Sequence, residues 1–156
     1  MDNLIQTLAI YAIPVIFAIT LHEAAHGYVA RHFGDPTAWQ LGRITLNPIK
    51  HIDLFGTLLM PALLLFVSKG AFLFGWAKPV PVDFGRLRNP KQDMLWVAAA
   101  GPGANLAMAL GWAAILKLAV VMPDYAYRLP LAARARAGIK VNSVLLLLTP
   151  LPIPPL

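Results

Sequence analysis

The sequence predicts an all-α integral membrane protein, a bundle of three to four transmembrane or re-entrant helices with extended loop segments. Hydrophobic residues make up 58% of the 156 positions and charged residues only 13%, against roughly 45–50% and about 25% in soluble domains. A chain this short cannot bury so many apolar side chains in one aqueous core, because small domains leave much of their surface exposed. We therefore expect residues 1–156 to form one membrane-embedded domain.

The first apolar run, residues 4–21, has no charge over about 18 residues, which is the usual length of a membrane-spanning helix. Its helical pattern continues as far as Phe33. Gly34 is then a candidate helix C-cap, and Asp35-Pro36 a candidate turn.

The second run, residues 54–67, is shorter and contains Gly56 and Pro61. Together with residues 71–77 it is long enough to span a membrane, and alone it is typical of a re-entrant or buried segment. Asp53 is a candidate N-cap for it.

Two further runs cover residues 94–122 and 139–151. The earlier one is rich in small residues around Gly101, which lets helices approach closely in lipid, and Pro102 predicts a bend in it. The later one ends in a run of prolines. The sequence KPVPV at 78–82 is expected to be extended, because each proline disfavours helix at the preceding residue.

The net charge of +6 does not indicate nucleic-acid binding, for which basic residues would form a stripe interleaved with aromatics. The basic residues occupy the polar stretches between apolar runs, as in loops that flank membrane spans. They form three sets: Arg31, Arg43 and Lys50; Lys78, Arg86, Arg88 and Lys91; Arg128, Arg134, Arg136 and Lys140.

A metal-binding motif follows the first apolar run, where residues 22–26 read HEAAH. Positions i and i+4 share one face of a helix, so His22 and His26 can ligate one metal ion. Glu23, the only glutamate in the chain, can then take a proton from a metal-bound water. Two imidazoles and one base at this spacing are typical of a zinc hydrolase.

A catalytic zinc site usually has three protein ligands, and the chain contains no cysteine to supply one. His32 points away from the face shared by His22 and His26, by the helical period. His51 and Asp53 are candidates for an alternative ligand or for support of the site. They are equally well interpreted as an interfacial histidine and a helix N-cap.

Five segments together resemble the site-two protease family of intramembrane zinc metalloproteases, in its compact bacterial branch without a PDZ domain. They are HEAAHGYVA (22–30), GRITLNPIKHIDLFGTLLMP (42–61), FGWAKPVPVD (74–83), AAAGPGANLAMAL (98–110) and NSVLLLLTPLPIPPL (142–156).

The resemblance implies a zinc endopeptidase that hydrolyses peptide bonds in or near transmembrane segments of other membrane proteins. It implies one Zn²⁺ per chain on His22 and His26, with Glu23 as the general base. Asn105 would reach the substrate or the oxyanion, with Gly101 and Pro102 near the substrate. From the residues alone, Asn105 is as well explained by a hydrogen bond across a helix interface. The expected setting is the lipid bilayer of a bacterial cell membrane, which the chain crosses several times.

The family's third zinc ligand is an aspartate in a Leu-Asp-Gly motif, and this sequence stops at Leu156, the leucine of that motif. We therefore expect the C-terminal end of the domain to be missing and the chain as written to be inactive for lack of that ligand. A transporter or channel with an intramembrane His/Glu relay and an inactive zinc-site fragment are the alternatives. Residues 78–82 either add a strand to an unwound substrate or form a plain proline-rich loop.

Overall fold

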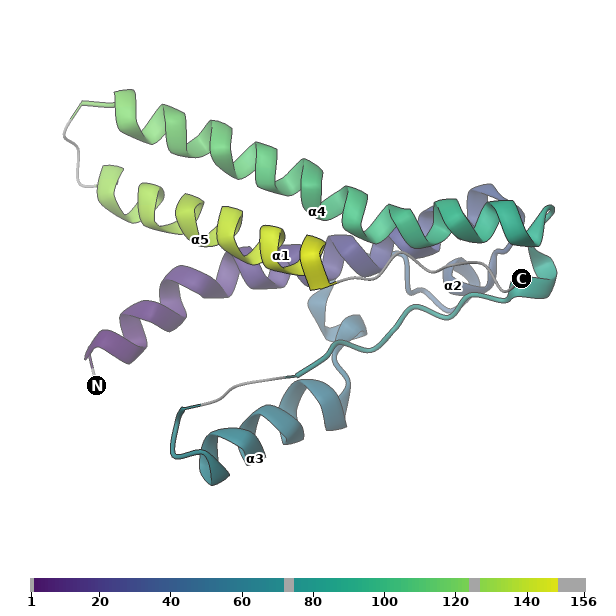
Figure 1. Ribbon diagram of the computed structural model, residues 1–156, viewed down its shortest axis with the longest axis horizontal. Coiled ribbons are helices and arrows are strands. Elements are labelled where there is room, and N and C mark those ends of the chain that lie inside the picture. The colour runs from purple at the N-terminus through teal and green to yellow at the C-terminus, as the bar shows by residue number, and fades with distance from the viewer. Residues whose placement is uncertain (1, 72–74, 124–126, 149–156) are drawn as a thin grey trace.

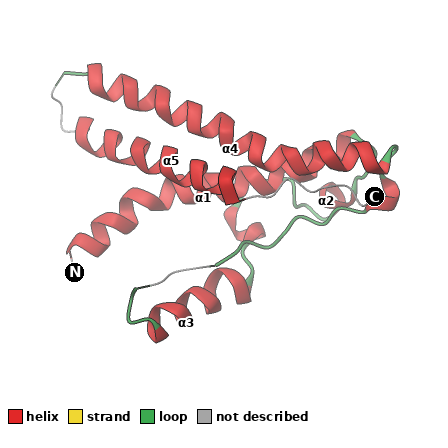
Figure 2. Ribbon diagram, in the orientation of Figure 1, coloured by secondary structure: helices red, strands yellow, loops and turns green. Residues whose placement is uncertain are grey.

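The computed structural model describes residues 2–71, 75–123 and 127–148, and no strand occurs among them (Figures 1 and 2). The all-α expectation is confirmed. The elements are α1 (Asp2–His32), α2 (Thr37–Gln40), the 3₁₀ helix η1 (Pro48–His51), the π-helix η2 (Leu54–Leu59), α3 (Met60–Val67), the 3₁₀ helix η3 (Phe84–Arg86), α4 (Pro90–Val121) and α5 (Arg128–Leu148).

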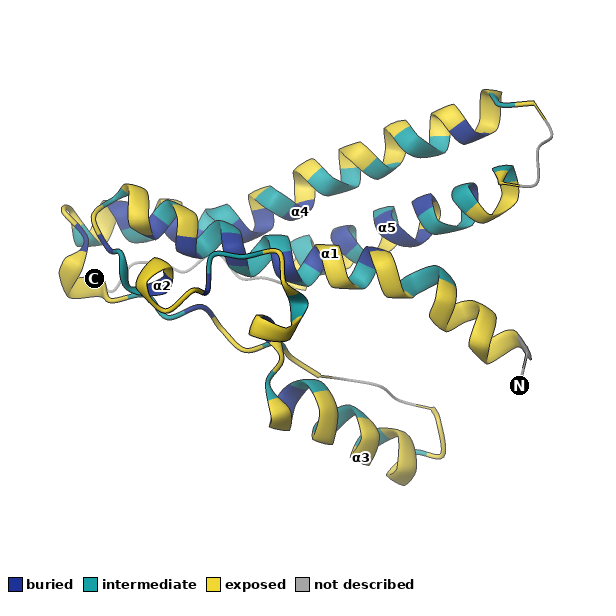
Figure 3. Cartoon of the chain, turned by 180° about the vertical axis from the view of Figure 1, so that it is seen from behind, coloured by how far each residue is buried: buried dark blue, intermediate teal, exposed yellow. Residues whose placement is uncertain are grey.

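Helices α1, α4 and α5 pack against one another, whereas α3 extends away from them (Figure 1). Buried residues line the facing sides of the three long helices (Figure 3). Most are small, because closely spaced helices leave room only for side chains such as those of Ala18, Ala98 and Ala135. At Gly138 on α5, a Cβ atom would overlap the Trp112 ring of α4.

Two helices are long and apolar enough to cross a membrane: residues Asn3–His32 of α1 and Pro90–Val121 of α4. Within the most apolar 18-residue stretch of each helix, only 17% and 11% of the residues are buried inside the protein. Their apolar side chains therefore face outward, unlike those of a core helix in a soluble protein. The apolar segment Leu54–Val67 is shorter. Among the described residues, these two helices meet the criteria for a span, and the predicted bundle of three to four counted re-entrant helices as well.

The first helix ends as predicted. It continues through the HEAAH motif to His32, and Gly34 adopts a left-handed conformation with φ +108°. The Asp35 N–H then donates to the Ala30 carbonyl at 2.9 Å. Glycine suits this position because a left-handed residue closes a helix and a side chain there is strained.

The second apolar run begins at the predicted cap. The Asp53 carboxylate accepts hydrogen bonds from the backbone N–H groups of Phe55 (2.9 Å) and Gly56 (3.4 Å). The first turns after it form the π-helix η2, and α3 ends at Val67 before a turn. Trp76 packs so closely on Gly56 that a Cβ atom there would overlap the indole.

The prediction for the last helix was wrong at its start. Arg128, Arg134 and Arg136 were expected in a polar stretch before the apolar run 139–151, but they lie within α5, as Lys140 does. Alanine, arginine, lysine and leucine are strong helix formers. Ala132, Ala135 and Ala137 give the segment a buried face of small residues. Tertiary packing of that face extends the helix by several turns beyond the apolar run.

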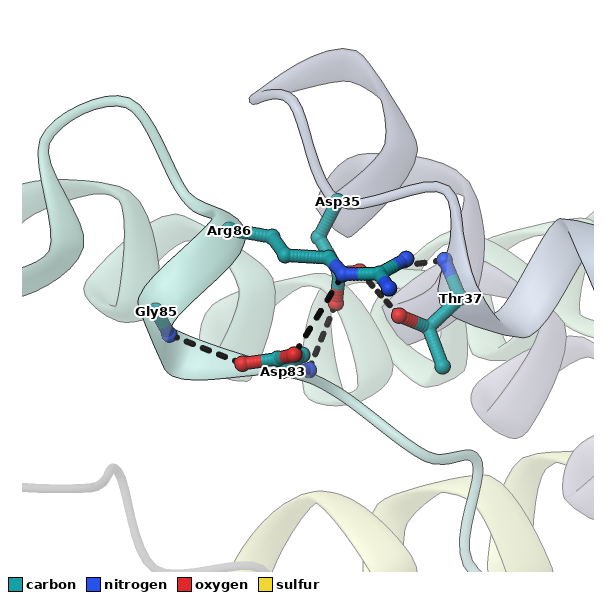
Figure 4. A network of polar contacts seen from close by, with 5 residues as sticks. All are labelled: Asp35, Thr37, Asp83, Gly85 and Arg86. Atoms are coloured by element: carbon teal, nitrogen blue, oxygen red, sulfur yellow. Dashed lines mark hydrogen bonds and ion pairs between the residues drawn. The ribbon is translucent and has the colours of Figure 1, made fainter.

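Asp35 connects the end of α1 to the loop before η3 (Figure 4). Its buried carboxylate accepts hydrogen bonds from the Thr37 N–H (3.0 Å), the Thr37 hydroxyl (2.5 Å) and the Asp83 N–H (2.7 Å). Asp83 in turn accepts from Gly85 (3.0 Å) and pairs with Arg86 (3.4 Å). Burial acts to raise the pKa of Asp35, but these hydrogen bonds and the Arg86 charge together hold that pKa below its usual 3.8.

We expect Asp35→Asn to lower the free energy of unfolding by about 1–3 kcal/mol, because an amide cannot accept all three hydrogen bonds. A carboxylate with a depressed pKa stabilises the fold above its unfolded pKa, and this contribution disappears as the pH falls through the folded value. The difference in melting temperature between wild type and variant should therefore shrink from about pH 7 to about pH 3. Thermal unfolding in detergent measures it, and an equal difference at both pH values would contradict this account.

Candidate functional site

The two histidines of the HEAAH motif face each other on α1. Their Nε2 atoms lie 3.1 Å apart, and the rings meet edge to face with centroids 4.7 Å apart. Both side chains are half-buried where α1 packs on α4. The i, i+4 spacing thus brings both imidazoles to one point, as the sequence predicted.

Hydrogen bonds to α4 fix the proton of each ring on Nδ1. His26 Nδ1 lies 2.6 Å from the Val97 carbonyl oxygen, which can only accept. His22 Nδ1 lies 2.5 Å from Asn105 Oδ1. The Asn105 amide nitrogen donates to Ala18 O (3.3 Å) and Asn142 Oδ1 (2.8 Å), so its oxygen faces His22. When a ring is neutral with its proton on Nδ1, its Nε2 presents a lone pair.

Two lone pairs that converge at 3.1 Å repel each other unless a proton or a metal cation lies between them. Zn–N bonds of about 2.0–2.1 Å in tetrahedral geometry separate two ligand nitrogens by about 3.3 Å, close to the observed spacing. Neutral imidazoles whose Nδ1–H donates to a carbonyl are also the usual form of zinc-ligating histidines. The donor set therefore fits a zinc ion.

Gly101 on α4 provides the space beside both Nε2 atoms. A Cβ atom at this position would overlap both of them, lying 2.5 Å from that of His22. Gly101 was predicted to lie near the substrate, and the structure places it directly against the histidine pair. Pro102 is buried next to it, and α4 continues through both residues as one helix.

Glu23 contacts the extended segment that follows α3. Its Oε2 accepts a hydrogen bond from the Val80 backbone N–H at 2.9 Å. Val80 also packs near Gly27, one turn further along α1, where a Cβ atom would lie 3.1 Å from the valine. The segment therefore lies along the helix that carries the motif. Its Val80 N–H holds one carboxylate oxygen of Glu23.

Residues 76–82 have no helix, as predicted, but their polar groups are bonded within the protein. The N–H groups of Trp76, Lys78 and Val80 donate to Gly56 O (3.0 Å), His51 O (2.9 Å) and Glu23 respectively. Of the intervening residues 77, 79 and 81, two are prolines without an N–H. A strand that adds to a substrate needs a row of free donors. This pattern therefore favours the proline-rich loop over the substrate-binding strand.

The other candidate ligands lie apart from the histidine pair. His51 is buried and its Nε2 donates to Thr45 O at 2.9 Å, while Asp53 caps η2. His32 is exposed. Within residues 2–71, 75–123 and 127–148, no group of three or more His, Cys, Asp or Glu side chains could hold a metal ion. Residues 149–156, including the PIPPL run, lie outside the described part of the chain.

Two partners of the site were missed from sequence. The Val97 carbonyl orients His26, and Asn142 on α5 contacts Asn105. Residue types do not reveal which backbone carbonyl will contact a given side chain. Asn142 did carry a signal: it is a polar amide at the start of an apolar run, where a buried partner is required.

Two relatives are similar to this chain over most of its length. It is 40% identical over 152 residues to "Putative zinc metalloprotease YwhC" of Bacillus subtilis, covering 92% of this chain and 63% of the relative. It is 29% identical over 138 residues to "Putative zinc metalloprotease Rip2" of Mycolicibacterium smegmatis, covering 88% and 50%. The chain thus spans between half and two thirds of their lengths. No protein-family model and no solved structure matches it.

Proposed function

We propose that this chain forms the histidine part of the active site of an intramembrane zinc metalloendopeptidase. The premise is that the chain belongs to a site-two protease-like family, which its two relatives, both named putative zinc metalloproteases, support. The observation that carries the proposal is the pair of Nε2 atoms of His22 and His26, 3.1 Å apart over the space left by Gly101. Two nitrogen lone pairs held in this way are suited to a shared divalent cation.

In this proposal His22 and His26 hold one Zn²⁺ per chain. When bound there, zinc supplies a Lewis acid that makes water acidic near neutral pH and polarises a peptide carbonyl. Glu23, one residue after His22, takes the proton from water as its oxygen attacks the carbonyl carbon. It then gives that proton to the leaving amine, so the peptide bond is hydrolysed with no net change in the enzyme.

Asn105 has a different role here from the one that the family resemblance implies. Its side chain is fully buried, its oxygen lies against His22, and its nitrogen donates to Ala18 and Asn142. These contacts use the groups that a substrate or oxyanion would need. We therefore assign Asn105 as a positioning residue that orients the His22 ring and fixes its proton on Nδ1.

The proposed setting is the bacterial cell membrane, crossed by several helices, with transmembrane proteins as substrates. Helices α1 and α4 carry both the candidate site and the apolar surface that suits lipid. The histidine pair is half-buried between α1 and α4, which limits its contact with bulk water.

Metal removal tests the proposal. The full-length protein in proteoliposomes should cleave a reporter that contains one transmembrane segment. A chelator should stop cleavage, and Zn²⁺ rather than Mg²⁺ should restore it, because imidazole ligands favour zinc. A reporter without the transmembrane segment is the matched control. Cleavage that persists without metal would overturn the zinc mechanism, and cleavage of the control alone would overturn the intramembrane substrate.

A further inference from the structure

Asn142 on α5 is the last member of a chain of hydrogen bonds that begins at His22 on α1. We propose that Asn142 is a positioning residue for the zinc site, acting through Asn105. This inference rests on the proposed function. Asn105 and Asn142 are both 0% exposed. They join three helices that are distant in sequence, since Asn105 lies 83 residues from His22 and 37 from Asn142.

The direction of each amide follows from its partners. The Asn142 nitrogen donates to the Gly138 carbonyl of its own helix at 2.8 Å, so its oxygen faces Asn105. That oxygen accepts from the Asn105 nitrogen at 2.8 Å, so the Asn105 oxygen faces His22 and accepts its Nδ1–H. Turning Asn142 around would place two donors against each other and two oxygens against each other. The α5 carbonyl therefore determines, through two amides, which His22 nitrogen presents a lone pair.

A second contact of Asn105 limits how much Zn²⁺ affinity is lost when Asn142 is replaced. Its nitrogen also donates to the Ala18 carbonyl, at the longer distance of 3.3 Å. Without Asn142, this weaker bond still favours the same amide orientation. Loss of a direct partner of a ligating histidine typically weakens metal binding about 10–100-fold. For Asn142, one bond further away, we expect a loss of about three- to tenfold.

The variant Asn142→Leu tests this, because leucine has a similar size and cannot hydrogen-bond. Zn²⁺ affinity of the full-length protein in detergent, measured by competition with a chelator, should fall about three- to tenfold. The conservative variant Asn142→Asp retains an oxygen for Asn105 and should recover most of the affinity. The control is Thr20→Val, which removes a buried hydroxyl of α1 that donates to the Ile16 carbonyl of its own helix. It should leave the Zn²⁺ affinity unchanged.

A double-mutant cycle separates positioning from packing. In an Asn105→Ala background, Asn142→Leu should cause no further loss of Zn²⁺ affinity, although both changes lower the melting temperature. An equal further loss in that background, or wild-type affinity in the single variant, would overturn the role of Asn142. If Asn142→Leu does not fold, Asn142→Ala takes its place in the cycle and is judged by the same two outcomes. Failure of the wild-type protein to bind Zn²⁺ would instead overturn the proposed function, and this inference with it.

Discussion

Gly101→Ala should abolish Zn²⁺ binding and therefore proteolysis. The added methyl group would overlap the Nε2 atoms of both His22 and His26, the two atoms proposed to hold the metal. Neither ring can retreat without breaking its Nδ1 hydrogen bond to Asn105 or to the Val97 carbonyl. We expect the Zn²⁺ affinity to fall by more than about 100-fold, beyond the loss typical of an outer partner.

The matched control for this change is Gly103→Ala. Gly103 lies two residues further along α4, is exposed, and would have nothing within 4 Å of an added Cβ. Alanine is favoured over glycine in a helix by about 1 kcal/mol, so both variants should fold with an intact α4. The metal content of the two purified variants shows whether Gly101→Ala has lost Zn²⁺ and Gly103→Ala has kept it. If Gly101→Ala bound Zn²⁺ as Gly103→Ala does, the metal would not lie between the two Nε2 atoms.

Glu23→Gln should reduce peptide-bond cleavage about 10²–10⁴-fold, the usual contribution of a general acid–base group. Glutamine has nearly the same shape and can still accept the Val80 N–H, but it cannot take a proton from water. Zn²⁺ affinity should stay at the wild-type level because Glu23 is not a ligand in this mechanism. The rate of reporter cleavage and the metal content of the same preparation provide the two measurements.

Glu23→Ala distinguishes the base from the structural contact. It removes the proton acceptor and also the 2.9 Å hydrogen bond to Val80. We expect it to be as inactive as Glu23→Gln but less stable, since the extended segment loses its hydrogen bond to α1. Cleavage near the wild-type rate in the glutamine variant would refute Glu23 as the base.

Local rules explain why much of the fold was predictable. The helical period placed His22 and His26 on one face, and Gly34 and Asp53 end and begin their helices through contacts with near neighbours in sequence. The start of α5 was not predictable in this way. Its charged residues suggested a loop, but Ala132, Ala135 and Ala137 form a helix face that has meaning only once α1 and α4 pack on it.

By itself, the sequence determined the apolar helices and the HEAAH motif, because composition and spacing within a few residues decide them. Only the tertiary structure decided what surrounds the motif. His26 is oriented by a carbonyl 71 residues away and His22 by an amide 83 residues away. Gly101 leaves the space between α4 and the two rings. Such contacts depend on how the helices pack against one another, which no pattern of neighbouring residues predicts.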